Sequence, residues 1–356
     1  MASTQLNSFS DPDKTFADMP PSIGELLSRV DIGAGRQELY ENQLPALLRQ
    51  MARQTRVESI RASVAIEGVE VAPKRAEKLA KPSRPKFRDR DEREFAGYAD
   101  AIDYLMRQES LDVIEPRDLL TMHAQLFKFT ETLGGRLKSE DNVIMTRDEK
   151  DGPRQTVFRP PSHRETEGRL INLCGSYAYA IENRIAHRLV LVGAFILDLL
   201  AIHPVEDGNG RIARLATSHE LLRLDYGVAR YISMEQLIYD TKNSYYDALE
   251  QSQKKWHTGE HNVWPWIRYL TTVLGDAYDD FESRVAAERG QSMPKRQRVR
   301  EWVATSAPDQ FKFSEAREGL PGISEKTIRT AFEELRVERV LDQKGRGAGS
   351  RYIKLS

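Results

Sequence analysis

The feature that most constrains the fold of this chain is an apolar run from Leu189 to Ile202, which is broken by Asp198. A helix needs about 20 consecutive apolar residues to cross a bilayer. The run is the longest of its kind in the chain, yet it is shorter than that and contains a carboxylate. We therefore predict that it forms a buried helix in a globular protein, and we expect no membrane contact.

Other segments show apolar residues at helical spacing, which predicts a mainly α protein. One or two amphipathic helices are expected between Arg36 and about Ala65, stopped by Gly68. The remaining helical patterns cover residues 94–107, 117–129, 164–181 and 265–289. The polar first twenty residues are expected to form an extended arm, and residues 72–93, rich in Lys, Arg and Pro, a solvated connection.

Length and composition set the outer limits of the interpretation. A chain of 356 residues exceeds the usual size of one domain, so two or three units are expected. Its 53 basic and 54 acidic residues give no overall bias toward nucleic acid. The single cysteine, Cys174, excludes an intrachain disulfide and favours a reducing compartment, and the chain start lacks a signal-peptide pattern. We predict a cytoplasmic protein.

Residues 203–214 read HPVEDGNGRIAR and hold most of the chemical information. Gly208 and Gly210, on either side of Asn209, allow a turn in which successive N–H groups point the same way. A helix beginning near Arg211 adds its positive end to that turn. Such a nest of N–H groups binds phosphate.

The charged residues of the same segment each meet a requirement of group transfer. Arg211 and Arg214 are three residues apart, so they share a helix face and can reach several phosphates. Asp207 can hold Mg²⁺ against those phosphates. His203 can accept the proton of an attacking hydroxyl because its ordinary pKa lies near neutrality. Together they predict a phosphoryl- or nucleotidyl-transfer site.

Each of these features, taken alone, has an ordinary structural explanation. A lone Gly-x-Gly is usually a turn, and one histidine at a helix end is usually structural. The glycines, arginines, aspartate and histidine all fall within the twelve positions 203–214, and this concentration favours the functional interpretation. A metal hydrolase that uses His203 with His219 ranks last, because the two are sixteen residues apart and no third ligand is evident.

The segment resembles the signature of the Fic family, His-Pro-Phe-x-Asp/Glu-Gly-Asn-Gly-Arg-x-x-Arg, with Val205 in the position where Phe is usual. The resemblance implies an enzyme that transfers AMP from ATP to a Thr, Tyr or Ser hydroxyl of a target protein or of itself. It implies that His203 is the base and Asp207 the Mg²⁺ ligand. The ATP-binding residues would be Gly208, Asn209, Gly210, Arg211, Ile212, Ala213, Arg214 and Tyr246. Relatives with altered signatures transfer UMP, phosphate or phosphocholine, but the intact Gly208-Asn209-Gly210 segment and both arginines favour AMP.

A short hairpin is predicted from residues 142–145 and 156–158, with a charged tip at 147–155. Together with Leu133-Gly134-Gly135-Arg136, it resembles the flap of Fic proteins, which holds the target by main-chain pairing. The flap residues would be Val143, Ile144 and Phe158.

Residues 63–68, SVAIEG, fit the inhibitory pattern Ser/Thr-x-x-x-Glu-Gly/Asn of many Fic proteins. The motif consists of Ser63, Glu67 and Gly68. The resemblance implies that Glu67 pairs with Arg214 and prevents ATP from binding with its triphosphate correctly placed.

The last segment has the order of parts of a winged helix-turn-helix. Ser324 is placed to cap a helix running to about Arg339, and strands are expected at Val340–Leu341 and Tyr352–Ile353, around a glycine-rich loop. From Lys295 onward there are fourteen Lys/Arg and nine Asp/Glu. The basic residues nearest a DNA groove would be Lys326, Arg329, Arg346 and Arg351. DNA and protein both remain candidate partners.

The sequence thus predicts a Fic-type helical core with a β-hairpin flap and a C-terminal winged helix. The expected domains are an inhibitory helical region at 1–110, a Fic core at 115–285 and a winged helix at 295–356. The main alternative is a DNA-binding regulator with a nucleotide-sensing Fic module. The oligomeric state stays open, a homodimer included.

Overall fold

The computed structural model describes residues 7–106, 112–145, 156–292, 294–345 and 350–355. It divides the chain into two compact units, residues 1–282 and 283–356. Residues 1–110 lie in the first unit together with the expected catalytic core, except for the last three residues of that core, 283–285. Within the described residues, no helix is both long and apolar enough to span a membrane.

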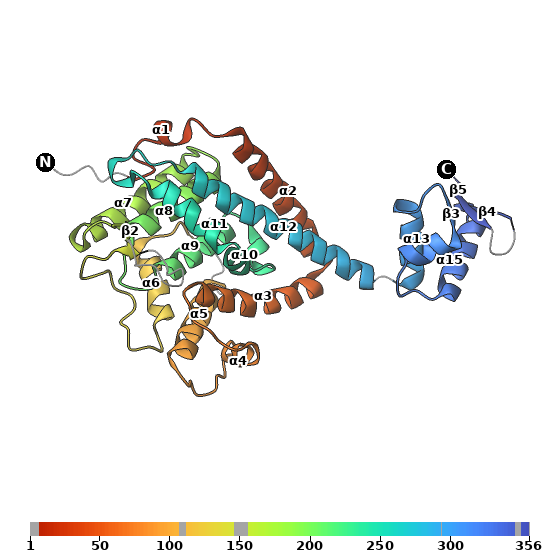
Figure 1. The fold of residues 1–356 in the computed structure, drawn as a ribbon, viewed down its shortest axis with the longest axis horizontal. Helices are drawn as coiled ribbons and strands as arrows, with labels where there is room; N and C mark the ends of the chain where they lie inside the picture. The colour runs from red at the N-terminus through yellow and green to blue at the C-terminus, as the bar shows by residue number, and fades with distance from the viewer. Residues whose placement is uncertain (1–6, 107–111, 146–155, 293, 346–349, 356) are drawn as a thin grey trace. The chain divides into compact units, whose positions relative to one another are not determined.

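The first unit is built almost entirely of helices (Figure 1). In chain order they are α1 (Pro12–Phe16), α2 (Pro21–Gln43), α3 (Pro45–Ile66), α4 (Pro73–Leu79), α5 (Arg90–Met106), α6 (Pro116–Leu126), α7 (His163–Glu182), α8 (Arg188–Ile202), α9 (Asn209–Arg223), η1 (Gly227–Arg230), α10 (Met234–Asp240), α11 (Lys242–Gln253), η2 (Trp256–Thr258) and α12 (Trp264–Ser292). An antiparallel hairpin of β1 (Ile144–Met145) and β2 (Thr156–Phe158) precedes α7. The mainly α prediction is confirmed.

Helix α8 is the centre of this unit, as its apolar run predicts. Every residue from Leu189 to Ile202 is buried, and α7, α9 and α11 pack against the helix. Residues on α2 and α12 bridge those two helices, which run side by side in Figure 1: Arg29 pairs with Asp276, and Arg36 pairs with Glu282.

The prediction of an extended N-terminal arm is wrong for the described residues, because residues 7–9 are buried. Asp198 on α8 accepts hydrogen bonds from the Ser8 amide at 2.8 Å and from the Trp256 indole at 2.7 Å. A buried carboxylate needs such donors, and burial raises the pKa of Asp198 to about 6. The N-terminal segment supplies two donors, the Ser8 amide and hydroxyl, from 190 positions away, which no local pattern could reveal.

The prediction of a solvated connection at residues 72–93 is also only partly right. The segment includes α4 and the start of α5, and Arg75 binds Glu92 through two hydrogen bonds of 2.6 and 2.7 Å. Arg84 pairs with Asp100. The basic residues that suggested a solvated loop therefore tie this segment to α5.

The second unit contains α13 (Lys295–Thr305), β3 (Gln310–Lys312), α14 (Phe313–Gly319), α15 (Glu325–Val337), β4 (Leu341–Lys344) and β5 (Arg351–Lys354). Its strands form an antiparallel sheet in the order β3-β5-β4. The core includes Phe311, Phe332, Leu335 and Tyr352. Ser324 caps α15 by accepting a hydrogen bond from the Thr327 amide, as predicted. Arg346 lies outside the described residues.

Candidate active site

The loop after α8 turns sharply and holds His203 in a half-buried position. His203 caps the helix with φ of 50°, and its amide donates to the Leu199 carbonyl. Its Nδ1 lies 3.3 Å from the Leu200 carbonyl oxygen, which can only accept, so Nδ1 carries the hydrogen. Nε2 is then left with a free lone pair. Burial lowers the pKa of His203 to about 4, so the ring is neutral near pH 7.

Asn209 closes this loop through its side chain. Its Oδ1 accepts from the Val205 amide at 3.1 Å, and its Nδ2 donates to the Val205 carbonyl at 2.7 Å. Val205 is buried, which is what the Phe position of the signature requires. With its side chain so used, Asn209 offers only its main-chain N–H to a ligand.

The N-terminus of α9 forms the predicted turn. Gly208 has φ of 88°, a conformation that favours glycine, and α9 begins at the next residue. The first N–H groups of a helix have no acceptor within it. Ile212 and Ala213 are buried among core side chains, and the Ile212 amide already donates to the Gly208 carbonyl at 2.9 Å. The donors left at this end of the helix are the earlier main-chain N–H groups. The loop and helix therefore aim main-chain donors at one place.

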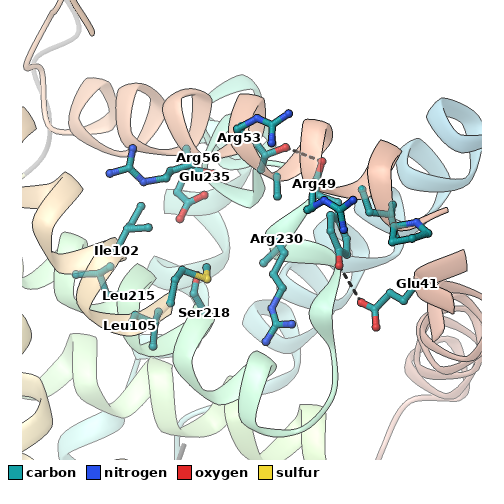
Figure 2. A pocket seen from close by; sticks show the side chains of 18 residues that line it. Glu41, Arg49, Arg53, Arg56, Ile102, Leu105, Leu215, Ser218, Arg230 and Glu235 are labelled. Atoms are coloured by element: carbon teal, nitrogen blue, oxygen red, sulfur yellow. Dashed lines mark hydrogen bonds between the residues drawn. The ribbon is translucent and has the colours of Figure 1, made fainter. Parts of the chain in front are cut away.

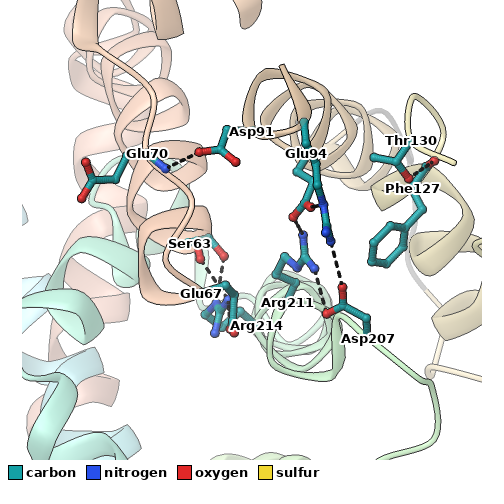
Figure 3. Close-up of polar contacts among 11 residues, drawn as sticks. Ser63, Glu67, Glu70, Asp91, Glu94, Phe127, Thr130, Asp207, Arg211 and Arg214 are labelled. Carbon is teal, nitrogen blue, oxygen red and sulfur yellow. Dashed lines mark hydrogen bonds and ion pairs between the residues drawn. The ribbon is translucent and has the colours of Figure 1, made fainter. Parts of the chain in front are cut away.

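Arg211 is buried and held by two carboxylates (Figure 3). Its Nη1 lies 2.7 Å from Glu94 on α5, and its Nη2 lies 3.2 Å from Asp207. The guanidinium also lies over the Phe127 ring, 5.0 Å from its centroid. Arg90 reaches both Glu94, at 2.5 Å, and Asp207, at 3.7 Å. The sequence interpretation missed Arg90 and Glu94.

Arg214 is bound by the end of α3, also shown in Figure 3. Its Nη2 lies 2.9 Å from Glu67 Oε1, and its Nε donates to Ser63 Oγ at 2.8 Å. Burial by itself lowers the pKa of Arg214, but Glu67 and two tyrosines raise it, and the net pKa lies above the ordinary value. A Cβ at Gly210 would lie 2.6 Å from Glu67 Oε1. The contact thus requires glycine at position 210.

The third guanidinium nitrogen of Arg214, Nη1, takes no part in these contacts. Nη1 is buried and has no hydrogen-bond partner among the described residues, and it lies beside Gly210, 3.2 Å from where a Cβ would stand. Arg211 Nε is likewise buried and unpartnered in the described part of the chain. Buried donors of this kind are rare unless a ligand or water completes them.

The base of the hairpin is tied to the His203 loop by Lys138, which the sequence interpretation also missed. Its buried Nζ donates to Asn142 Oδ1 at 3.0 Å, to the Pro161 carbonyl at 2.8 Å and to the Ile202 carbonyl at 3.3 Å. Burial lowers the pKa of Lys138 to about 8. This lysine fixes the distance between the hairpin and the loop.

The predicted flap residues differ in exposure. Ile144 pairs with Phe158 in the antiparallel register, and the predicted tip, residues 147–155, lies outside the described residues. Val143 is 43% exposed, whereas Phe158 is buried and stacks on His257 at 5.2 Å. Phe158 therefore anchors the hairpin, and only its main chain is available for pairing.

Tyr246 is half-buried on α11, edge-on to Tyr245 at 5.1 Å between centroids. Tyr245 is buried and lines a small cavity together with Arg214. Of the two tyrosines, Tyr245 is thus the one that the structure places beside a predicted ATP-binding arginine.

Comparison with known proteins identifies the family of the domain that carries this site. Residues 113–221 match the Fic/DOC family. No curated protein sequence matches the chain. A solved Fic family protein from Desulfovibrio desulfuricans G20 is similar over 95% of this chain and 97% of its own, with a TM-score of 0.62 and 20% identity.

Two further solved structures are similar over less of this chain. A signalling protein with a Fic domain from Bacteroides thetaiotaomicron covers 72% of this chain and 95% of its own, with a TM-score of 0.55 and 20% identity. Fic-1 from C. elegans covers 75% of this chain, with 74% of its own residues aligned, a TM-score of 0.58 and 17% identity. Residues 113–221 therefore form a Fic domain, and the chain that carries it has the fold of Fic family proteins.

Proposed function

We propose that this protein is an adenylyltransferase that moves AMP from ATP to a Thr, Tyr or Ser hydroxyl of a target protein or of itself. The observation that carries the proposal is the unpartnered Nη1 of Arg214, buried beside Gly210 at the N-terminus of α9. An anion at this place would receive main-chain donors, a helix end and a guanidinium together. A triphosphate supplies enough oxygens for all of them.

His203 is the base in this proposal. Because its Nδ1 donates to the Leu200 carbonyl, Nε2 carries no hydrogen and can act as the acceptor. Nε2 takes the proton of the target hydroxyl while that oxygen forms a bond to the α-phosphorus of ATP. The bond from the α-phosphorus to the oxygen bridging to the β-phosphorus breaks, and pyrophosphate leaves with that electron pair. The fold positions the base, and the target supplies the nucleophile.

Asp207 fits a Mg²⁺ ion that arrives with ATP. Its carboxylate is half exposed, and the described residues hold no cluster of three metal-ligating side chains. Mg²⁺ commonly binds through one or two carboxylates and the phosphates of its substrate. Bound there, the ion would neutralise phosphate charge. A hydrolase centred on His203 and His219 finds less support, since His219 Nδ1 contacts the Glu220 carboxylate at 2.9 Å.

We further propose that Glu67 restrains the enzyme. A carboxylate 2.9 Å from Arg214 occupies the guanidinium that the triphosphate needs. ATP that binds without this contact would present its α-phosphorus at the wrong angle for in-line attack. Removing Glu67 should then raise transfer without altering the base.

The test is labelling of the purified protein with ATP carrying radioactive phosphorus at the α-position. Glu67→Gly should label itself strongly and wild type weakly, and the matched control Glu70→Gly, an exposed glutamate three residues later, should resemble wild type. Adding His203→Ala to Glu67→Gly should lower labelling by roughly 10²–10⁴-fold. Label transferred from the γ-position instead would show phosphate transfer and overturn the proposal, and mass analysis would reveal UMP or phosphocholine transfer.

The second unit motivates a further function, binding of DNA. Its helices and strands follow in the order expected of a winged helix, and Lys326 on α15 and Arg351 on β5 are exposed. The wider basic surplus is partly neutralised, since Arg296 pairs with Glu334 and Arg300 with Glu338. Gel shifts of the full chain with duplex DNA across salt concentrations test this. Lys326→Ala should reduce the salt slope by about one unit, and absence of binding at low salt would eliminate the function.

The free cysteine bears on the location of the protein in the cell. Cys174 is buried and free, and a lone unpaired cysteine suits a reducing compartment. We propose the cytoplasm, and labelling of intact and lysed cells with a membrane-impermeant lysine reagent would test it.

A further inference from the structure

A cavity of about 640 Å³ lies between α3, α5, α9 and η1 (Figure 2). None of the residues lining it belongs to the His203–Arg214 segment. Its volume falls within the range of small-molecule sites, roughly 300–1,000 Å³. The cavity is therefore a separate feature that the proposed transfer reaction leaves unexplained.

The inner wall of the cavity is apolar. Leu48 from α3, Ile102 and Leu105 from α5 and Leu215 from α9 line it, and all four are largely buried. In Figure 2 the side chains of Ile102, Leu105 and Leu215 lie below α3. A ligand with an apolar body would remove this surface from water, which favours binding.

The charged residues around the cavity are mainly basic. Arg49, Arg53 and Arg230 line it and are exposed, and none of them is within ion-pair distance of a carboxylate in the described chain. Arg56 also lines it, but Asp103 neutralises it with hydrogen bonds of 2.7 and 2.8 Å. Among the described residues, these three guanidinium groups of Arg49, Arg53 and Arg230 thus have no ion-pair partner.

Two glutamates offset this charge only in part. Glu41 accepts a hydrogen bond from the Tyr231 hydroxyl at 3.0 Å. Glu235 is buried at the inner end, and burial raises its pKa, which disfavours its charged form. The cavity therefore combines an apolar wall with a net positive rim, which is complementary to an amphipathic anion.

We propose that this cavity binds a small organic anion whose apolar body packs on Leu48, Leu105 and Leu215 and whose carboxylate, sulfonate or phosphate group meets Arg49 and Arg53, four residues apart on α3. The proposal does not depend on the transfer reaction, because it is tested by binding alone. A site of this kind needs both halves of the ligand. Inorganic phosphate by itself has nothing to place against the apolar wall.

The probe is 8-anilino-1-naphthalenesulfonate, whose fluorescence rises in an apolar site, titrated into the full chain. The double variant Arg49→Gln/Arg53→Gln should weaken binding by about tenfold or more, since it removes charge-assisted hydrogen bonds. Arg61→Gln is the matched control, because Arg61 is an exposed arginine of the same helix that does not line the cavity. It should bind the probe as wild type does.

A second pair of measurements separates the two halves of the ligand. Decanoate should displace the probe, and inorganic phosphate should not. Ala52→Trp, which places an indole in the cavity, should abolish the saturable signal even if the arginine variants prove unstable. Equal affinity in wild type and Arg49→Gln/Arg53→Gln, displacement by phosphate, or unchanged binding in Ala52→Trp would each overturn the proposal.

Discussion

Helix α9 carries two buried arginines three residues apart, and each is paired with a glutamate from another helix. Arg211 meets Glu94, whose side chain is 4% exposed and lies within α5. Arg214 meets Glu67, whose side chain is 30% exposed and lies at the C-terminal end of α3. The two pairs look alike in sequence spacing on α9, yet their partners differ in burial and in attachment.

The difference indicates which pair belongs to the fold and which can open. Glu94 lies within α5 and also binds Arg90, and its departure would leave the buried Arg211 with only the half-exposed Asp207 as counter-charge. Glu67 is followed by Gly68 with φ of 87°, where the helix has already ended. Glu67, a partly exposed carboxylate at a helix end, can itself move into water, and a phosphate that takes its place would keep the buried Arg214 paired. This is the property that the proposed restraint by Glu67 requires.

The largest expected effect separates the pairs by stability. Glu94→Ala should lower the free energy of unfolding of the first unit by about 3–5 kcal/mol, because one partner of a buried ion pair is removed. Urea denaturation followed by tryptophan fluorescence measures it, with Glu67→Ala as the matched comparison. If both alanine variants lost the same stability, the distinction drawn between the pairs would be wrong.

A smaller loss is expected from Ser63→Ala. The variant removes the acceptor of the Arg214 Nε–H bond and leaves that donor buried, which costs about 1–3 kcal/mol. Because Arg214 would lose this hydrogen bond, self-labelling should also rise, though less than in Glu67→Gly. Ser28→Ala, an exposed serine on α2, is the control for both measurements. If Ser63→Ala labelled itself no more than wild type does, Glu67 would restrain the enzyme without a contribution from this hydroxyl.

Glu67→Gln tests the charge of the second pair while keeping its shape. Stability should fall less than in Glu94→Ala, because the amide keeps a hydrogen bond to Arg214 that alanine would lose. Self-labelling should nevertheless rise, because an amide competes poorly with a triphosphate for a guanidinium. A variant that is much less stable and no more active would assign Glu67 to the fold, like Glu94.

What the sequence could predict depended on whether the signal was local. The apolar run predicted α8, and the spacing of glycines and arginines predicted the turn at Gly208. The pairing of Glu67 with Arg214 came from the resemblance to Fic proteins, and the 2.9 Å contact bears out that geometry.

The contacts that were missed join residues far apart in the chain. Glu94 meets Arg211 across 117 positions, and Lys138 reaches the Ile202 carbonyl across 64. An acidic residue in a helix, or a lysine after a turn, has an ordinary solvated explanation in sequence. Only the packing of α5 on α9, and of the hairpin base on the loop, removes these side chains from water and gives them partners.

The smallest effect is expected from a change of pH, and it concerns His203. Burial lowers the pKa of His203 to about 4 from an ordinary 6.5, so the unfolded chain binds its proton more tightly. Stability linked to His203 therefore rises with pH between about 4 and 6.5 and is constant above that range. In Glu67→Gly, kcat/KM for ATP should likewise stay constant from pH 6.5 to 8, because the base is already neutral. The contrary outcome is a kcat/KM at pH 6.5 that is about half the value at pH 8, with no matching loss of protein stability at pH 6.5. His203 would then titrate as an exposed histidine, and the loop would not bury it.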